Sequence, residues 1–221
     1  MASGAPAAVR LSLGPWIRMN DLGWWSGDLH VHRPLADVPA LMKTEDLNVA
    51  VSYTMWNTQQ RSRSDWTGKP APAATVESVS PRHLHMIMNA EDERGGGAWM
   101  LIGLPGPFEM TPAEPWYPQG LTFVERARAL RPKGGVLPWF DCEKLIWWEA
   151  PVVMAFGAPD SVSLLFNHFN QYGIHDAEAW GRPRDQKQFP GPEGFVHYVL
   201  GLHYRYLNLG FRFAQGAGSA S

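Results

Sequence analysis

The sequence contains very little cysteine, since Cys142 is the only one among 221 residues. A single cysteine cannot form an intrachain disulfide, which excludes a disulfide-stabilised scaffold. No run of eighteen or more apolar residues is present, so we expect no membrane partner for this segment. Glycine-rich dinucleotide motifs and phosphate-binding loops are also absent. These absences indicate that the chain is an ordinary globular domain.

The sequence has no excess of charge of one sign. Its 19 basic and 21 acidic residues give a formal net charge of −2 and are scattered along the chain. A protein that binds nucleic acid or an anionic membrane usually carries a basic patch. We therefore expect no nucleic-acid partner and predict a small-molecule substrate. The oligomeric state is not indicated by the sequence.

The length of 221 residues and the apolar fraction of 45% are typical of one domain with a full core. Residues 1–22 lack the basic and long apolar regions of a secretory signal, and we interpret them as a flexible leader. Residues 215–221 are small and polar, which predicts a flexible tail. The domain is expected over residues 23–214.

Strand-like and helix-like segments alternate along the chain, and this pattern favours an α/β fold with a parallel sheet. The sheet is expected either to close into a barrel or to remain open and doubly wound. Residues 59–81 are polar and rich in proline and serine, and we interpret them as a loop. Strands are predicted at residues 27–33, 47–54, 85–91, 98–104, 135–140, 161–166 and 211–213, and helices at 38–46, 122–130, 144–156 and 195–209.

Two histidines, His30 and His32, lie in the first predicted strand. Side chains alternate between the two faces of a strand, so both imidazoles are expected on one face. Two imidazoles on one face can share a cation, although two polar residues can also simply face solvent. Further polar residues follow other predicted strands, at Thr54 and Asn57, at Glu91, at Asp141 and Glu143, and at Asn167 and His168. In α/β barrels the carboxyl ends of the strands carry the active site.

These residues carry a resemblance to a known family. Residues 27–32 (Gly-Asp-Leu-His-Val-His) resemble the opening motif of the PHP (polymerase and histidinol phosphatase) metallohydrolases, in particular their carbaryl-hydrolase-like branch. Similar segments occur at residues 91–98, at 144–148, at 160–161 together with 167–168, and at 178–185. The resemblance implies a distorted (β/α)7-type barrel, complete or truncated, with one to three divalent metals. It also implies hydrolysis of a phosphoester, ester or amide bond.

Three ligands that are common in this family are absent from the chain. Trp56 stands where a ligand histidine is usual, residues 97–98 are Gly-Ala where Gly-His is usual, and residues 218–221 lack the usual Asp-x-His. A site for three metals is therefore not expected. Two alternatives remain, a site for a single metal and a barrel that binds no metal.

One divalent cation can still be bound by the residues that remain. His30, His32 and His168 offer three neutral nitrogens and Glu91 offers an oxygen, a set that suits zinc best, with manganese or iron as alternatives. Water bound to such a cation loses a proton near neutral pH. The predicted cofactor is accordingly one divalent metal ion.

Several residues are candidates for the remaining chemistry. Asp141, Glu143 or Asp160 can transfer protons, and the sequence does not distinguish among them. Lys144 can polarise a carbonyl or phosphoryl oxygen, or it can be a solvated residue at the start of a helix. We predict Asp141, Lys144 and Asp160 as catalytic residues.

Three residues are predicted to contact the substrate. Trp56 and Asn57 follow the strand at residues 47–54, and Trp56 is expected to line the pocket and to exclude a second metal. Arg94 can bind an anionic group through its guanidinium. The alternative for Arg94 is a buried salt bridge to Asp92 or Glu93.

Two functions of different classes follow from these residues. The first is a metal-dependent hydrolase of a small-molecule ester, amide or phosphoester. The second is a non-catalytic barrel that binds a small ligand, a carbohydrate or a partner protein. If the chain is a fragment, an exposed sheet edge is expected to favour oligomers.

Overall fold

The computed structural model describes residues 9–58, 61–94, 96–110, 119–157, 159–170, 172–176 and 183–221. Part of the predicted leader (residues 1–8) and part of the resembling segment at 178–185 (residues 178–182) lie outside the described residues. The described part is a mixed α/β fold with parallel and antiparallel strand pairs. Residues 19–22 of the predicted leader form a 3₁₀ turn, η1 (Met19–Leu22).

A four-stranded sheet contains the first strands of the chain. Its order is β1 (Gly27–Val31), β2 (Val49–Ser52), β6 (His83–Met86) and β5 (Val76–Ser80), and only the β5–β6 pair is antiparallel. Helix α1 (Val38–Thr44) packs Val38 and Met42 against Val31 and Ala50 of the sheet. The helix predicted at residues 38–46 is confirmed within two residues.

A seven-stranded sheet contains most of the other strands. Its order is β13 (Ala214–Ala217), β10 (Ser161–Leu165), β9 (Trp139–Cys142), β8 (Trp99–Ile102), β7 (Ala90–Glu93), β3 (Met55–Thr58) and β4 (Ser62–Ser64). Strand β8 is antiparallel to both of its neighbours, and β4 is antiparallel to β3. The parallel sheet expected from the β/α alternation is therefore replaced by mixed sheets. Two strands, β4 and β5, also lie within the predicted loop at residues 59–81.

The chain passes between the four-stranded and the seven-stranded sheet three times, after β2, β4 and β6. Strand β2 is followed closely by β3, and β6 by β7, so neighbouring strands of one sheet continue as neighbouring strands of the other. This continuity places the carboxyl end of β1 near β7. In the part of the chain that the structure describes, the strands form a four-stranded, a seven-stranded and a two-stranded sheet, and no closed barrel is detected.

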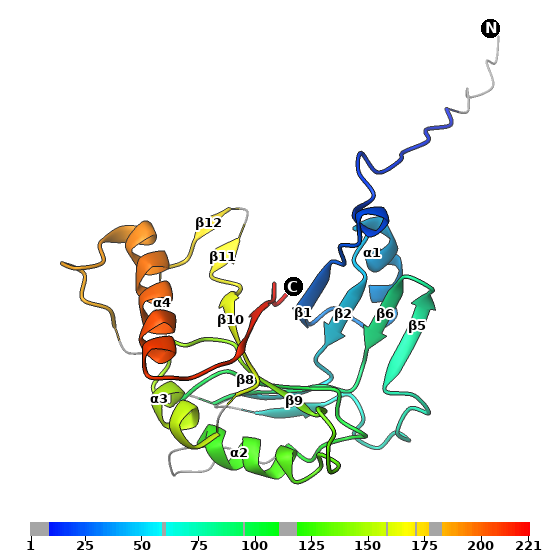
Figure 1. The fold of residues 1–221 in the computed structure, drawn as a ribbon. Coiled ribbons are helices and arrows are strands. Elements are labelled where there is room, and N and C mark those ends of the chain that lie inside the picture. The colour runs from blue at the N-terminus through cyan, green and yellow to red at the C-terminus, as the bar shows by residue number, and fades with distance from the viewer. Residues whose placement is uncertain are drawn as a thin grey trace, which may run out of the picture.

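The segment predicted as a flexible tail, residues 215–221, contains most of strand β13. Strand β13 pairs in parallel with β10. It begins one residue after the strand predicted at residues 211–213. Beyond β13, the amide of Ala220 donates to the carbonyl of His30 (2.8 Å), and the amide of His32 donates to the carbonyl of Ser221 (2.6 Å). Figure 1 shows the C-terminus beside β1. Small residues allow this close approach, and the main-chain hydrogen bonds hold it.

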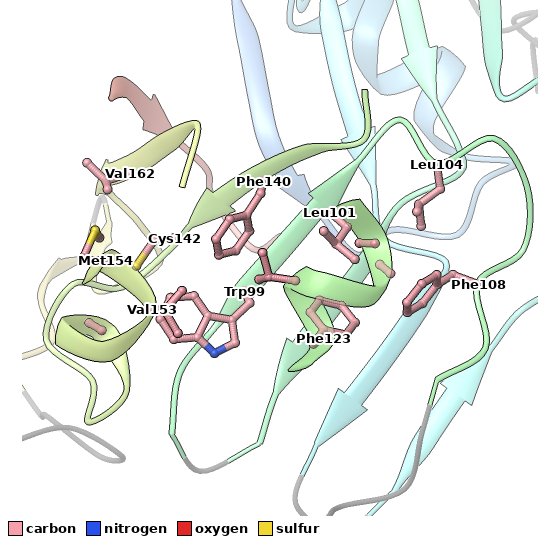
Figure 2. Packing of buried hydrophobic residues seen from close by; sticks show 14 of the residues in the cluster. Trp99, Leu101, Leu104, Phe108, Phe123, Phe140, Cys142, Val153, Met154 and Val162 are labelled. Atoms are coloured by element: carbon pink, nitrogen blue, oxygen red, sulfur yellow. The ribbon is translucent and has the colours of Figure 1, made fainter. Parts of the chain in front are cut away.

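The largest core lies around the seven-stranded sheet. Trp99, Leu101 and Phe140 project from β8 and β9 and pack against Phe123 of α2 (Gln119–Arg128), as Figure 2 shows. All four residues of β8 are buried, because the strand is covered on both faces. Full burial of one such aromatic side chain contributes about 1.5–3 kcal/mol. Burial on both faces explains why the sequence of β8 is a continuous apolar run.

Pro151 decides the structure of the predicted helix at residues 144–156. It occupies the first turn of α3 (Ala150–Val152), where its missing N–H costs little, and a π-helical turn, η2 (Val153–Gly157), follows. The helix is therefore short and begins at Ala150. The C-terminal helix α4 (Gly191–Asn208) packs near a small hairpin of β11 (Phe169–Asn170) and β12 (Gly173–Ile174). None of the described helices is long and apolar enough to cross a membrane.

Candidate metal centre

Three side chains converge where the two sheets meet. His30 comes from β1, His32 follows β1, and Glu91 comes from β7. The Nε2 atoms of the two histidines are 2.8 Å apart, and Oε2 of Glu91 lies 2.9 Å from Nε2 of His32 and 3.3 Å from Nε2 of His30. The predicted shared face of His30 and His32 is confirmed, and these three residues form a group that can hold a metal ion.

A second layer of charged residues supports His30. Oε1 of Glu143 lies 2.8 Å from Nδ1 of His30, so His30 can donate its Nδ1–H to this carboxylate. The other oxygen of Glu143 accepts a hydrogen bond from Nζ of Lys144 at 2.5 Å, and Lys144 also lies 3.6 Å from Glu93. A carboxylate that accepts from one nitrogen of a histidine orients the other nitrogen toward a metal. The pair His30 and Glu143 has this arrangement.

The protonation of this cluster is set by competition between burial and charge. Burial disfavours the charged form of His30, but Glu91 and Glu143 outweigh it and raise the pKa of His30 to about 10. Burial likewise opposes ionisation of Glu91, yet His30 and His32 hold the pKa of Glu91 well below its usual range. For Glu143, Lys144 and His30 overcome burial and lower the pKa. Without a cation, the protonated His30 therefore lies between two carboxylates.

The donor atoms fit a divalent transition metal. Oε2 of Glu91 is buried and has no hydrogen-bond partner of regular geometry among the described residues. It faces two imidazole nitrogens, and two nitrogens with one carboxylate oxygen are a usual donor set for zinc, iron or manganese. Such a cation would be bound by this oxygen together with the two imidazole nitrogens. The fit is good for a single ion.

His168, the fourth predicted ligand, does not join this group. Its ring stacks on Phe195 of α4 with a centroid distance of 5.7 Å and contacts Phe166 at 5.3 Å. Burial and the nearby Lys144 lower the pKa of His168. The structure does not bring His168 to the other predicted ligands, because aromatic packing holds its ring against α4.

Asp160, a predicted catalytic residue, lies away from the group. It precedes β10 and lies beside Phe140 of the parallel neighbour β9, whereas Glu143 follows the end of β9. Its carboxylate pairs with Arg131 at 2.6 Å and accepts a hydrogen bond from the amide of Phe140. Asp160 therefore joins the α2–β9 connection to the sheet and is not part of the metal group.

Asp141 and Lys144 are the other two predicted catalytic residues. Both lie beside the cluster and form hydrogen bonds with neighbouring side chains. Asp141 accepts hydrogen bonds from the hydroxyls of Ser161 and of Ser163, the latter at 2.9 Å. Burial raises the pKa of Asp141 to about 6. Lys144 is fully buried, which excludes the alternative of a solvated helix start, and it is held by Glu143.

The three residues predicted to contact substrate occupy different environments. Trp56 is partly exposed, and its ring centroid lies 5.0 Å from that of His32. Arg94 is buried and forms two hydrogen bonds with Asp92, at 2.5 and 2.7 Å. Asn57 is fully buried and bonds to the same Asp92. Arg94 thus forms the buried salt bridge that was its alternative, and only Trp56 stands beside the metal group at a surface.

Sequence reasoning missed two features of the centre. Glu143 was a candidate for proton transfer, whereas the structure gives it the contact with His30. Tyr53 was not considered, yet its ring lies 5.1 Å from that of His30 and its buried hydroxyl has no hydrogen-bond partner in the described part of the chain. Burial and the nearby carboxylates raise the pKa of Tyr53, so it stays protonated. An aromatic residue in an apolar strand gives no sequence signal for such a position.

The C-terminal segment supports His30 from outside. Asp28 accepts hydrogen bonds from the amides of His30 and Ser219, both at 2.9 Å, and from the hydroxyl of Ser219 at 2.5 Å. A Cβ added at Gly218 would lie 2.5 Å from Cβ of His30. Only glycine fits this contact without a shift of β1.

We expect the substitution Gly218→Ala to weaken metal binding. The added methyl group would push β1 away and misplace His30, and a misplaced ligand shell typically costs about 10- to 100-fold in affinity. The measurement is a competitive titration of zinc against a chromophoric chelator. Gly201→Ala on α4, where a Cβ would meet nothing within 4 Å, is the matched control. Unchanged zinc affinity in Gly218→Ala would contradict this role of the segment.

Comparison with known proteins gives no relative, because no family model, curated protein or solved structure matches the chain.

Proposed function

We propose that this protein is a metal-dependent hydrolase that holds one divalent cation, preferably zinc, at His30, His32 and Glu91. The observation that carries the proposal is the convergence of two imidazole nitrogens and a buried carboxylate oxygen on one point. The contact between His30 and Glu143 adds independent support, since metal-binding histidines usually donate their other N–H to a carboxylate.

The bound cation would supply Lewis acidity and a water acidic enough to ionise near neutral pH. The side chains around the cation position the ligands. Glu143 fixes the tautomer and orientation of His30, and Lys144 holds Glu143 in place. Tyr53 lines the same pocket as His32, and its buried hydroxyl stays protonated beside His30.

The resemblance to the PHP metallohydrolases and the distorted barrel belong to the same proposal. Residues 27–32, which carry the resemblance, supply two of the three donor atoms. The hydrogen bonds between residues 218–221 and β1 bring the edge strands of the two sheets together, which supports a barrel-like arrangement. The bond cleaved is expected to be an ester, amide or phosphoester of a small molecule.

Elemental analysis combined with hydrolysis assays tests the proposal. We expect about one equivalent of zinc, iron or manganese per chain after reconstitution, since one donor group is present. Hydrolysis of 4-nitrophenyl acetate or phosphate should disappear with a chelator and return with the metal. A reconstituted protein without stoichiometric metal would favour the non-catalytic barrel instead.

The affinity for the cation should rise with pH. His30 carries a proton in the metal-free protein up to a pKa of about 10, and a metal ligand must be a neutral imidazole. Binding at neutral pH therefore releases about one proton, and the apparent affinity should rise about tenfold per pH unit between about pH 6.5 and 8.5.

Isothermal titration calorimetry in buffers of different ionisation enthalpy counts the released protons. The conservative variant Glu143→Gln keeps the size of the side chain but removes one of the charges that raise the pKa of His30. We expect fewer protons released in this variant at pH 8. An affinity that does not change with pH in the parent protein would contradict the protonated His30.

A further inference from the structure

A pocket of about 480 Å³ opens beside the metal centre. It lies between the loop that follows β1 and the β3–β4 hairpin, together with the turn that follows β4. The residues that decide its chemistry are His32, Tyr53, Trp56, Trp66, Arg33 and Lys69. His32 belongs both to the pocket and to the metal group, so the two features are continuous.

The exposure of the three donor side chains shows from where a molecule can approach. The side chain of His32 is 25% exposed, whereas those of His30 and Glu91 are 3% and 1% exposed. Approach to the cation therefore occurs from the side of His32. The part of a substrate that extends beyond the reacting bond would then occupy this pocket.

The walls of the pocket present rigid aromatic surfaces. Trp56 lies next to His32, and Trp66 is fixed because its Nε1–H donates to Oγ1 of Thr54 at 2.9 Å. The same Thr54 hydroxyl donates to the carbonyl of Ile87, which anchors the arrangement to the sheet. Flat side chains that are held in place favour a planar, aromatic ligand.

The charges around the pocket are mostly positive. Three basic residues line it, and Asp65 is the single acidic one. Asp65 pairs with Arg63 at 2.9 Å, which offsets that charge. Arg33 and Lys69 form no ion pair with any described residue, so two positive charges remain. These charges favour an anionic ligand group.

We propose that the substrate is an aryl compound with an anionic group, a carboxylate, sulfate or phosphate, that is separate from the bond cleaved. Its ring packs against Trp56 and Trp66, and its anionic group binds Arg33 and Lys69. This inference rests on the proposed hydrolase function, because it assigns the substrate class of the same site.

The test uses two probes that differ in charge, naphthalene-2-sulfonate and the neutral 2-naphthalenemethanol, titrated by calorimetry. We expect the sulfonate to bind at least about tenfold more tightly, as expected for a hydrogen bond to a charged group. The Arg33→Ala/Lys69→Ala variant should bind both probes equally. Lys43→Ala, an exposed lysine on α1 outside the pocket, is the matched control and should keep the preference.

Titrations of chelated protein separate this inference from the proposed function, because binding of the probes requires neither metal nor hydrolysis. A preference for the sulfonate in chelated protein, lost in the double variant, supports the pocket even if hydrolysis assays fail. Equal binding of both probes would overturn it even if the metal and the hydrolysis are found. Trp56→Ala should weaken both probes, whereas Trp148→Ala, an exposed tryptophan outside this pocket, should not.

Discussion

The double variant His30→Ala/His32→Ala is expected to lose the bound metal and to hydrolyse substrate more than about a hundredfold more slowly than the parent. The variant removes two of the three donor atoms, and Glu91 alone offers only one carboxylate. Elemental analysis and initial rates on 4-nitrophenyl substrates measure both effects on the same samples.

A second variant protects this test against loss of the fold. Without His30, the buried Glu91 and Glu143 lose a charged partner, which is costly. His32→Ala alone removes the most exposed donor and should leave the fold intact while it also releases the metal. His197→Ala, an exposed histidine on α4, is the matched control and should keep metal and rate. Metal retained at one equivalent in the double variant would refute the assigned ligands.

The substitution Arg94→Ala should lower the free energy of unfolding by about 3–5 kcal/mol. Burial raises the pKa of Asp92, while Arg94 and Asn57 favour its ionised form. Removal of Arg94 leaves this carboxylate buried without its charged partner. Urea denaturation followed by tryptophan fluorescence gives the change in unfolding free energy.

Two further variants show whether Arg94 stabilises the fold or contacts the substrate. Arg82→Ala breaks an ion pair with Asp21 in which both side chains are about half exposed, so it should cost about 0–1 kcal/mol. Asp92→Leu/Arg94→Met replaces the buried pair by apolar residues and should recover much of the loss. If Arg94→Ala keeps full stability and only raises KM, then Arg94 has the substrate role predicted from the sequence.

The first prediction concerns a group whose members lie far apart in the chain. The metal group combines β1 from one sheet with β7 from the other, and residues 218–221 fasten β1 from outside. His30 is therefore positioned by segments separated by nearly the whole chain. Substitutions at Gly218 and Glu143 probe this assembly without a change of ligand.

The amino-acid sequence by itself determined the local features. Alternation placed His30 and His32 on one face, apolar runs located β2, β8 and β10, and Pro151 explains why the helix predicted at residues 144–156 is a short α3. These features depend on neighbours within a few residues, and side-chain periodicity and backbone sterics report them directly. Polar residues after strands also pointed to Glu91 for the same reason.

Only the tertiary structure decided which distant groups meet. It made β8 antiparallel, ordered residues 214–221 against β10 and β1, and paired Asp160 with Arg131 and His168 with Phe195. It also brought Glu143 to His30. Strand pairing and buried charge pairs depend on contacts between residues far apart in sequence, and a local pattern carries no information about such partners.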